Sequence, residues 1–176
     1  KLEKVTIPDS VTSIGAAAFC ECSSLKEVFI PDSIHYIGIS PFHSCSNLVK
    51  VRLSKSLTSI ELRTFKYCYN LKEISLPSSL NSIEAEGFSD CGNLEKITIP
   101  SSVKTINDYA FSCCCKLNEI LFENHSKLSL IGYLAFYNCY AIKNIKIPSS
   151  VTEIGSHAFC YCCQMVKVTF DCSSSL

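Results

Sequence analysis

The side chains best suited to chemistry in this chain are its cysteines and histidines, which number thirteen and four among 176 residues. The cysteines concentrate in two runs, Cys113–Cys115 and Cys160–Cys163. Structural zinc sites usually combine paired C-x₂₋₄-C elements so that four ligands converge on one ion. In each run the middle cysteine belongs to a buried position of the repeat described below, and no histidine pattern accompanies it. We therefore expect no metal site and no cofactor.

Catalysis by a cysteine nucleophile requires a neighbouring histidine that accepts the thiol proton. His43 occupies the position equivalent to Cys20 one repeat later, and His157 precedes Cys160 by three residues. Both pairs fall on an outer turn of the repeat, and nothing nearby suggests an oxyanion hole or a closed pocket. Exposed polar side chains explain both pairs better, and the sequence predicts a protein that is not an enzyme.

A repeat organises the whole chain, and Leu94–Lys116 shows it most cleanly as LEKITIPSSVKTINDYAFSCCCK. Successive copies are 23 residues apart, except for one interval of 25 residues before Ile142. The opening apolar residue recurs at Leu2, Leu25, Leu48, Leu71, Leu94, Leu117, Ile142 and Met165. One cysteine per repeat follows a phenylalanine by three residues, at Cys22, Cys45, Cys68, Cys91, Cys114, Cys139 and Cys162. A fixed period of this length indicates a solenoid, in which each repeat packs only against its neighbours.

Each repeat divides into three segments. In LEKITI, the apolar residues Ile97 and Ile99 alternate with polar ones, which is typical of a short strand with one buried face. Val103 and Ile106 mark a second extended segment. Residues 107–114, NDYAFSCC, place aspartate, alanine and phenylalanine at helical spacing, which predicts a short α-helical or 3₁₀ turn. The predicted fold class is an α/β repeat protein with parallel strands.

The composition and the ends of the sequence set further expectations. An apolar content of 47% with 18% charged residues excludes disorder, and a net charge of zero gives no field that favours nucleic acid. No apolar run reaches the length of a membrane span. We expect one solenoid over residues 1–176, with seven full repeats and part of an eighth. Neither end carries a polar cap, which favours a piece of a longer array and end-to-end self-association.

The repeat L-x-x-V-x-I-P-x-S-V-T-x-I-G-x-x-A-F-x-x-C resembles the BspA-like leucine-rich repeat family, most closely at Leu25–Ile37 and Ile142–Cys162. The resemblance implies a curved, right-handed leucine-rich-repeat solenoid with its parallel strands on the concave face. It also implies a surface or secreted protein of a microbe or protist, of adhesion or antigen type, that binds a partner protein. The family offers no shared catalytic residues. The general leucine-rich pattern has asparagine or cysteine where this chain has serine, so asparagine-ladder arguments do not transfer.

The cysteines outside the repeat favour a different setting. Six are extra, at Cys20, Cys113, Cys115, Cys160, Cys163 and Cys172. A disulfide needs Cα atoms within roughly 7 Å, which adjacent repeats offer only at equivalent positions. No extra cysteine has an extra partner in the next repeat, so most thiols are expected to be free. Free thiols fit the cytoplasm, and the alternative function is an intracellular structural scaffold within a larger assembly.

The sixth repeat, Leu117–Ala141, is two residues longer than its neighbours. The segment ENHSK, residues 123–127, carries the extra length and is expected to form a loop after the strand. It contains the sequon Asn124-His125-Ser126. In a secreted protein Asn124 would suit a glycan, although such a tripeptide also arises by chance.

Two columns of side chains point outward from the predicted strands. The first alternates in charge and largely neutralises itself, at Lys4, Glu27, Lys50, Glu73, Lys96, Glu119, Asn144 and Lys167. The column beside it holds Thr6, Phe29, Arg52, Ser75, Thr98, Leu121, Lys146 and Thr169. Outward aromatic and arginine side chains often anchor interfaces, and outward Phe29 and Leu121 have no evident role in folding. The hypothesis is that Phe29, Arg52, Leu121 and Lys146 carry ligand binding.

Overall fold

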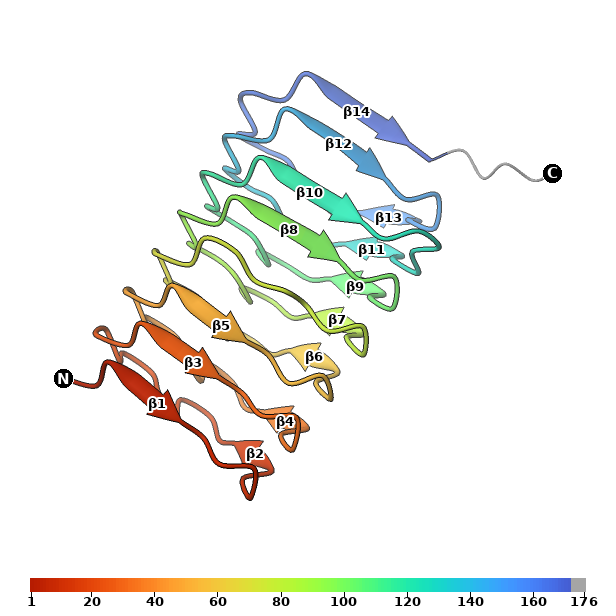
Figure 1. The fold of residues 1–176 in the computed structure, drawn as a ribbon. Helices are drawn as coiled ribbons and strands as arrows, with labels where there is room; N and C mark the ends of the chain where they lie inside the picture. Colours follow the sequence, from red (N-terminus) through yellow and green to blue (C-terminus); the bar gives the residue numbers. More distant parts are fainter. Residues whose placement is uncertain (172–176) are drawn as a thin grey trace.

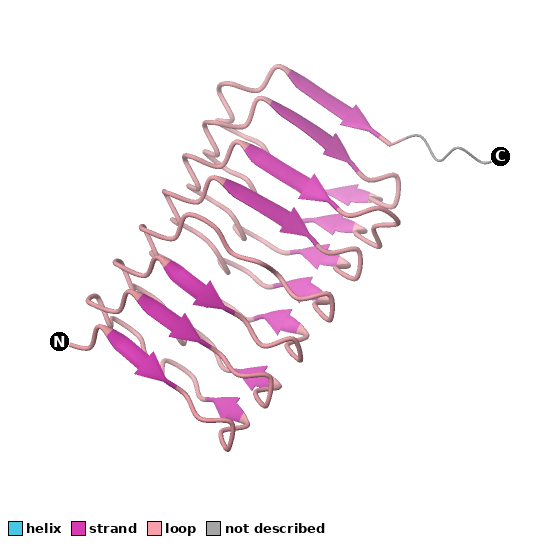
Figure 2. Ribbon diagram, in the orientation of Figure 1, coloured by secondary structure: helices cyan, strands magenta, loops and turns pink. Residues whose placement is uncertain are grey.

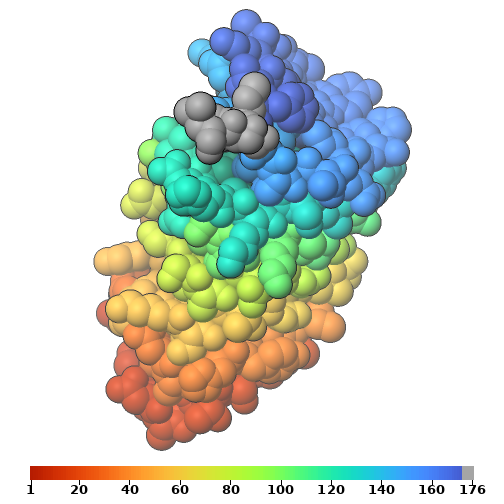
Figure 3. Space-filling view, turned by 90° about the vertical axis from the view of Figure 1, so that its right-hand side faces the viewer, coloured from red at the N-terminus to blue at the C-terminus, as the bar shows by residue number. Residues whose placement is uncertain are grey.

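In the computed structural model, which describes residues 1–171, the chain winds into a stack of successive turns, one per repeat (Figure 1). The longer strand of each turn lies on one face, called the strand face from here on. Its strands are β1 (Lys4–Thr6), β3 (Glu27–Phe29), β5 (Lys50–Arg52), β8 (Lys96–Ile99), β10 (Glu119–Phe122), β12 (Asn144–Ile147) and β14 (Lys167–Phe170). Strands β1 and β14 lie at opposite ends of the stack, and the space-filling view shows the repeats as successive bands (Figure 3).

Strands on this face pair in parallel and in register, one repeat apart. Val28 on β3 lies beside Val5 on β1, and Ile97 on β8 lies beside Ile120 on β10. These alternate apolar residues point inward, and Val28 and Ile97 are fully buried. The ladder is interrupted in the fourth repeat, where a single bridge joins Glu73 to Lys96. It is interrupted again between β10 and β12, which belong to two separate two-stranded sheets.

The second extended segment predicted for each repeat is confirmed. It forms two-residue strands that pair in parallel behind the strand face: β2 (Ser13–Ile14), β4 (Tyr36–Ile37), β6 (Ser59–Ile60), β7 (Ser82–Ile83), β9 (Thr105–Ile106), β11 (Leu130–Ile131) and β13 (Glu153–Ile154). The serine before this segment ties neighbouring repeats together. Ser102 Oγ donates to the Leu80 carbonyl at 2.6 Å, and Ser150 Oγ donates to the Leu128 carbonyl at 2.7 Å. Both bonds satisfy carbonyl groups that the bend leaves without a ladder partner.

The helical turn predicted for the third side of each repeat was wrong, and with it the α/β class, because residues 1–171 contain no helix (Figure 2). The amide of Phe111 donates to the Ala135 carbonyl of the next repeat at 2.8 Å, while the neighbouring Ala110 amide closes a tight turn onto Asn107. Tyr109 and Cys113 have φ values of 58° and 59°. A helix needs every amide to bond within its own segment and every φ to be negative. The segment is instead a run of turns whose alternate amides bond to the next repeat.

The core between the two sheets is built from columns of equivalent residues. Seven phenylalanine rings stack along it, with centroids 5.2–5.7 Å apart from Phe19 to Phe159. The repeat cysteines form a second column, as predicted, and six of the seven are buried. Each buried thiol donates to the phenylalanine carbonyl of the preceding repeat, as Cys114 Sγ does to the Phe88 carbonyl at 3.2 Å. The thiols therefore serve both as small apolar groups and as weak donors to carbonyls that face the core.

The last described turn leaves apolar side chains uncovered. Val168 and Phe170 stand at positions that are inward in the other repeats, yet they are 42% and 58% exposed. Val166 beside them is 84% exposed. Exposed strand edges with apolar layers tend to associate.

We therefore expect this chain to self-associate through the apolar end layer. Sedimentation at increasing concentration should show species larger than a monomer. The double variant Val166→Glu, Phe170→Lys should remain monomeric, because it places charges in the contact. A wild-type chain that sediments as a monomer at every concentration would contradict this expectation.

Candidate functional site

Phe29 and Arg52 lie next to each other on the strand face. They are paired across β3 and β5, and both side chains point outward. Phe29 is half-buried, and the Lys50 ammonium lies 5.4 Å from its ring centroid, at cation–π distance. The Arg52 guanidinium contacts the Asp32 carboxylate at 3.5 Å. This pair therefore forms a small patch in which an aromatic ring is framed by two cations.

Leu121 and Lys146 form a second patch farther along the stack. Leu121 on β10 is 41% exposed, and Lys146 on β12 makes an ion pair with Asp171. Both side chains line one groove, described below. Leu121 stands three repeats beyond Arg52, about 14 Å away at the usual strand spacing. The four predicted binding residues thus share one face but form two separate pairs.

The alternating charge column of the strand face pairs as predicted at several steps. Lys4 contacts Glu27 at 2.7 Å, and Lys96 contacts Glu119 at 2.8 Å. The hydrogen bond from Lys4 holds the pKa of the Glu27 carboxyl below its usual value. Exposed pairs of this kind contribute well under about 1 kcal/mol each. Their main effect is to cancel charge along the strand face, and that cancellation stops at Asn144.

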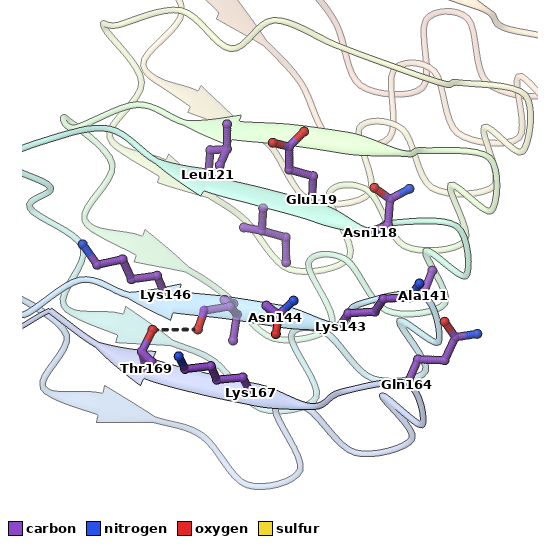
Figure 4. A pocket seen from close by; sticks show the side chains of 12 residues that line it. Asn118, Glu119, Leu121, Ala141, Lys143, Asn144, Lys146, Gln164, Lys167 and Thr169 are labelled. Atoms are coloured by element: carbon purple, nitrogen blue, oxygen red, sulfur yellow. Dashed lines mark hydrogen bonds between the residues drawn. The ribbon is translucent and has the colours of Figure 1, made fainter.

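A groove of about 940 Å³ opens where the alternation stops, between β10 and β12 (Figure 4). Its walls carry Leu121, Lys143, Asn144, Lys146 and Lys167. A smaller hollow continues past Leu121 and Lys146 to the inserted loop and Asn124. Sequence reasoning identified Leu121 and Lys146 but missed the groove and the other two lysines. The available signal was the coincidence of the two-residue insertion with the end of the alternating charge column.

Asn124 itself is exposed on the inserted loop. The Ser126 hydroxyl accepts a hydrogen bond from the Leu128 amide at 3.2 Å and thereby shapes the loop. Glycosylation at Asn124 stays a prediction.

The cysteine–histidine pairings show none of the electrostatics of an activated thiol. Burial raises the pKa of the Cys20 thiol and lowers the pKa of His43. Both shifts favour the neutral forms, whereas a thiolate–imidazolium pair requires the opposite shifts. Burial also raises the pKa of the core thiol Cys45 to about 12 and that of Cys162 to about 11.

The cysteines of residues 1–171, twelve in all, are free thiols, and Cys172 lies outside the described residues. Cys113 and Cys115 share one neighbour, because the Asn138 amide nitrogen lies 3.8 Å and 3.9 Å from their sulfur atoms. Within residues 1–171, no group of three or more His, Cys, Asp or Glu side chains is placed to hold a metal ion.

Tyrosines gather on the turn side of the stack, which sequence reasoning did not single out. Tyr109 and Tyr133 meet edge to face at 5.4 Å, and Tyr133 continues to His157 at 6.1 Å. Tyr137 and Tyr161 form a similar pair at 5.4 Å. The signal in the sequence was their spacing of 24 residues, which follows the repeat. These rings give the C-terminal half of the turn side an exposed aromatic surface.

The sequence matches the protein family described as BspA type leucine rich repeat region, through a profile of six copies over residues 1–118 and 81–175. No curated protein matches it. Within residues 1–171, nothing helical has the length and apolar character that a membrane crossing requires.

Several solved structures share the fold. A leucine-rich repeat protein from Bacteroides ovatus is 34% identical with a TM-score of 0.85, over 91% of this chain and 41% of that one. A leucine rich cell surface protein from Faecalibacterium prausnitzii is 32% identical with a TM-score of 0.83, over 93% of this chain and 44% of that one. The pneumococcal vaccine antigen PcpA is 26% identical with a TM-score of 0.56, over 97% of this chain and 38% of that one. The chain spans less than half the length of each.

Proposed function

The chain belongs to the BspA-type leucine-rich repeat family, and from that premise we propose that it is a protein-binding module of adhesion or antigen type, exposed on a cell surface or secreted. Two similar structures support the setting, one called a cell surface protein and one a vaccine antigen. Because the chain spans only part of those proteins, the proposal concerns this solenoid.

The observation that carries the proposal is the outward layer of the strand face. Phe29 and Leu121 occupy one outward column, beside Arg52 and Lys146 respectively. Aromatic, apolar and arginine side chains held on paired strands are the usual anchors of protein interfaces. A rigid strand face also limits the conformational entropy that a partner must overcome on binding.

An intracellular scaffold is the second candidate, and the free thiols favour it. The side chains of Cys115 and Cys163 are exposed, and nothing in residues 1–171 pairs them. Exposed thiols persist more readily in a reducing compartment. A membrane-impermeant maleimide applied to intact cells separates the two settings, because it labels these cysteines only if the protein lies outside.

The binding role can be tested by photo-crosslinking in the full-length protein within its own cells. A photo-reactive residue in place of Leu121 should yield adducts with a partner protein. The same residue in place of Thr58, exposed on the opposite side of the repeat, serves as the control. Equal adducts at both positions, or none at Leu121, would contradict the proposal.

We expect the double variant Phe29→Ser, Leu121→Ser to bind the crosslinked partner at least about tenfold more weakly, because it removes two candidate anchors. Its free energy of unfolding should change by less than about 1 kcal/mol, since both side chains point outward. The matched control is Tyr36→Ser, Ile39→Ser, which removes two exposed apolar side chains from another surface. Equal binding by wild type and the Phe29→Ser, Leu121→Ser variant would remove these residues from the site.

A further inference from the structure

The groove between β10 and β12 lies where the parallel ladder is open. Strand β10 pairs with β8, and β12 pairs with β14, but within residues 1–171 no ladder joins β10 to β12. Peptide groups along the two facing edges therefore lack the ladder partner that other strands have. Open strand edges of this kind accept an added extended chain.

The inserted loop accounts for this opening. The Glu123 amide donates to the Ile99 carbonyl at 3.1 Å, and the Lys127 amide donates to the Ser101 carbonyl at 2.9 Å. The Glu123 carboxylate also accepts from the Ser101 amide at 2.9 Å. All three bonds hold the loop against the preceding repeat. The insertion thus anchors the end of β10 toward β8, and β12 begins a separate pair of strands.

The groove has an excess of positive charge. Lys143, Lys146 and Lys167 surround Asn144 on its walls (Figure 4). The Glu119 carboxylate at the same groove is engaged by Lys96 at 2.8 Å, and Asp171 pairs with Lys146. Within the described part of the chain, Lys143 and Lys167 make no ion pair. Elsewhere on the strand face lysines at equivalent positions have a partner, as Lys26 has in Glu3 at 2.8 Å.

We propose that the groove between β10 and β12 binds an extended acidic segment of a partner protein, an assignment that rests on the protein-binding function proposed above. Carboxylates of the segment pair with Lys143 and Lys167. Its main chain bonds to the open strand edges, and Leu121 provides an apolar contact beside them. Charge complementarity selects this occupant, because the rest of the strand face largely neutralises its own charges.

The test uses fluorescence anisotropy with a labelled short peptide of alternating glutamate and leucine. The purified chain should bind this peptide at low salt, and the affinity should fall as salt is raised. The double variant Lys143→Gln, Lys167→Gln should bind about five- to tenfold more weakly, as expected for the loss of two exposed charge contacts. The control Lys26→Gln, Lys72→Gln removes the same charge from elsewhere on the strand face and should bind like wild type.

Two further probes separate the peptide from other occupants. A peptide of the same sequence with N-methylated amides cannot donate to the strand edges and should bind more weakly. A sulfated oligosaccharide of equal charge that binds as well as the peptide would overturn the inference. So would equal losses in the groove variant and the control variant. Adducts at Leu121 together with no peptide binding would reject the acidic segment and leave the protein-binding role intact.

Discussion

Replacing Phe111 with alanine is expected to lower the free energy of unfolding by about 3–5 kcal/mol. The ring is fully buried, with centroids 5.2 Å from Phe88 and 5.3 Å from Phe136. Its loss interrupts the column in the middle of the stack, where both neighbouring repeats depend on it. Urea denaturation followed by circular dichroism measures the change.

Phe29→Ala provides the matched control, because it removes the same side chain from a half-buried outward position. Its cost is expected to stay near about 1 kcal/mol. Similar losses for Phe111→Ala and Phe29→Ala would show that the inward column does not dominate stability.

The second large effect is destabilisation at alkaline pH. Burial raises the pKa of Cys45 to about 12 and holds the pKa values of Cys68, Cys91 and Cys139 well above their ordinary value. The fold favours the protonated thiols, so their contribution is complete below about pH 9 and is lost as the pH rises toward the folded values. Each thiol contributes a slope of about 1.4 kcal/mol per pH unit. Four thiols give about 5 kcal/mol per unit, enough to unfold a typical domain by about pH 10–11.

The measurement is urea denaturation at several pH values between 8 and 10.5, with a phosphine reductant to prevent oxidation. The variant Cys91→Ala removes one titrating thiol from the column. Its pH slope should be shallower than that of wild type by about 1.4 kcal/mol per unit, whatever its stability at neutral pH. An unchanged slope would mean that the core thiols do not set the alkaline limit, and that lysine and tyrosine titration does.

The core was readable from the sequence because the repeat states it many times. The inward positions of one repeat, such as Leu94, Ile97 and Val103, recur in the others, and all three are fully buried. The third side was not readable. Residues 107–114 have helical spacing, yet Tyr109 and Cys113 adopt positive φ. Bonds to the next repeat offset that local cost, and single-segment patterns carry no information about such bonds.

The candidate site divides in the same way. The adjacency of Phe29 and Arg52 follows from counting repeats, and the structure pairs them. The contact of Arg52 with Asp32 joins different columns and could not be counted. The groove depends on how the backbone of the inserted loop is anchored to Ser101, which the insertion alone does not specify.

The register of the phenylalanine column also bears on how such a gene can change. The step from Phe111 to Phe136 spans two more residues than the others, yet its rings remain 5.3 Å apart. The added length is absorbed at the periphery, beside the open ladder. Deleting or duplicating one whole 23-residue unit would likewise preserve every column while altering only the number of layers. Recombination between units can therefore lengthen or shorten the array freely, whereas novelty in its binding surface enters through small insertions that leave the column in register.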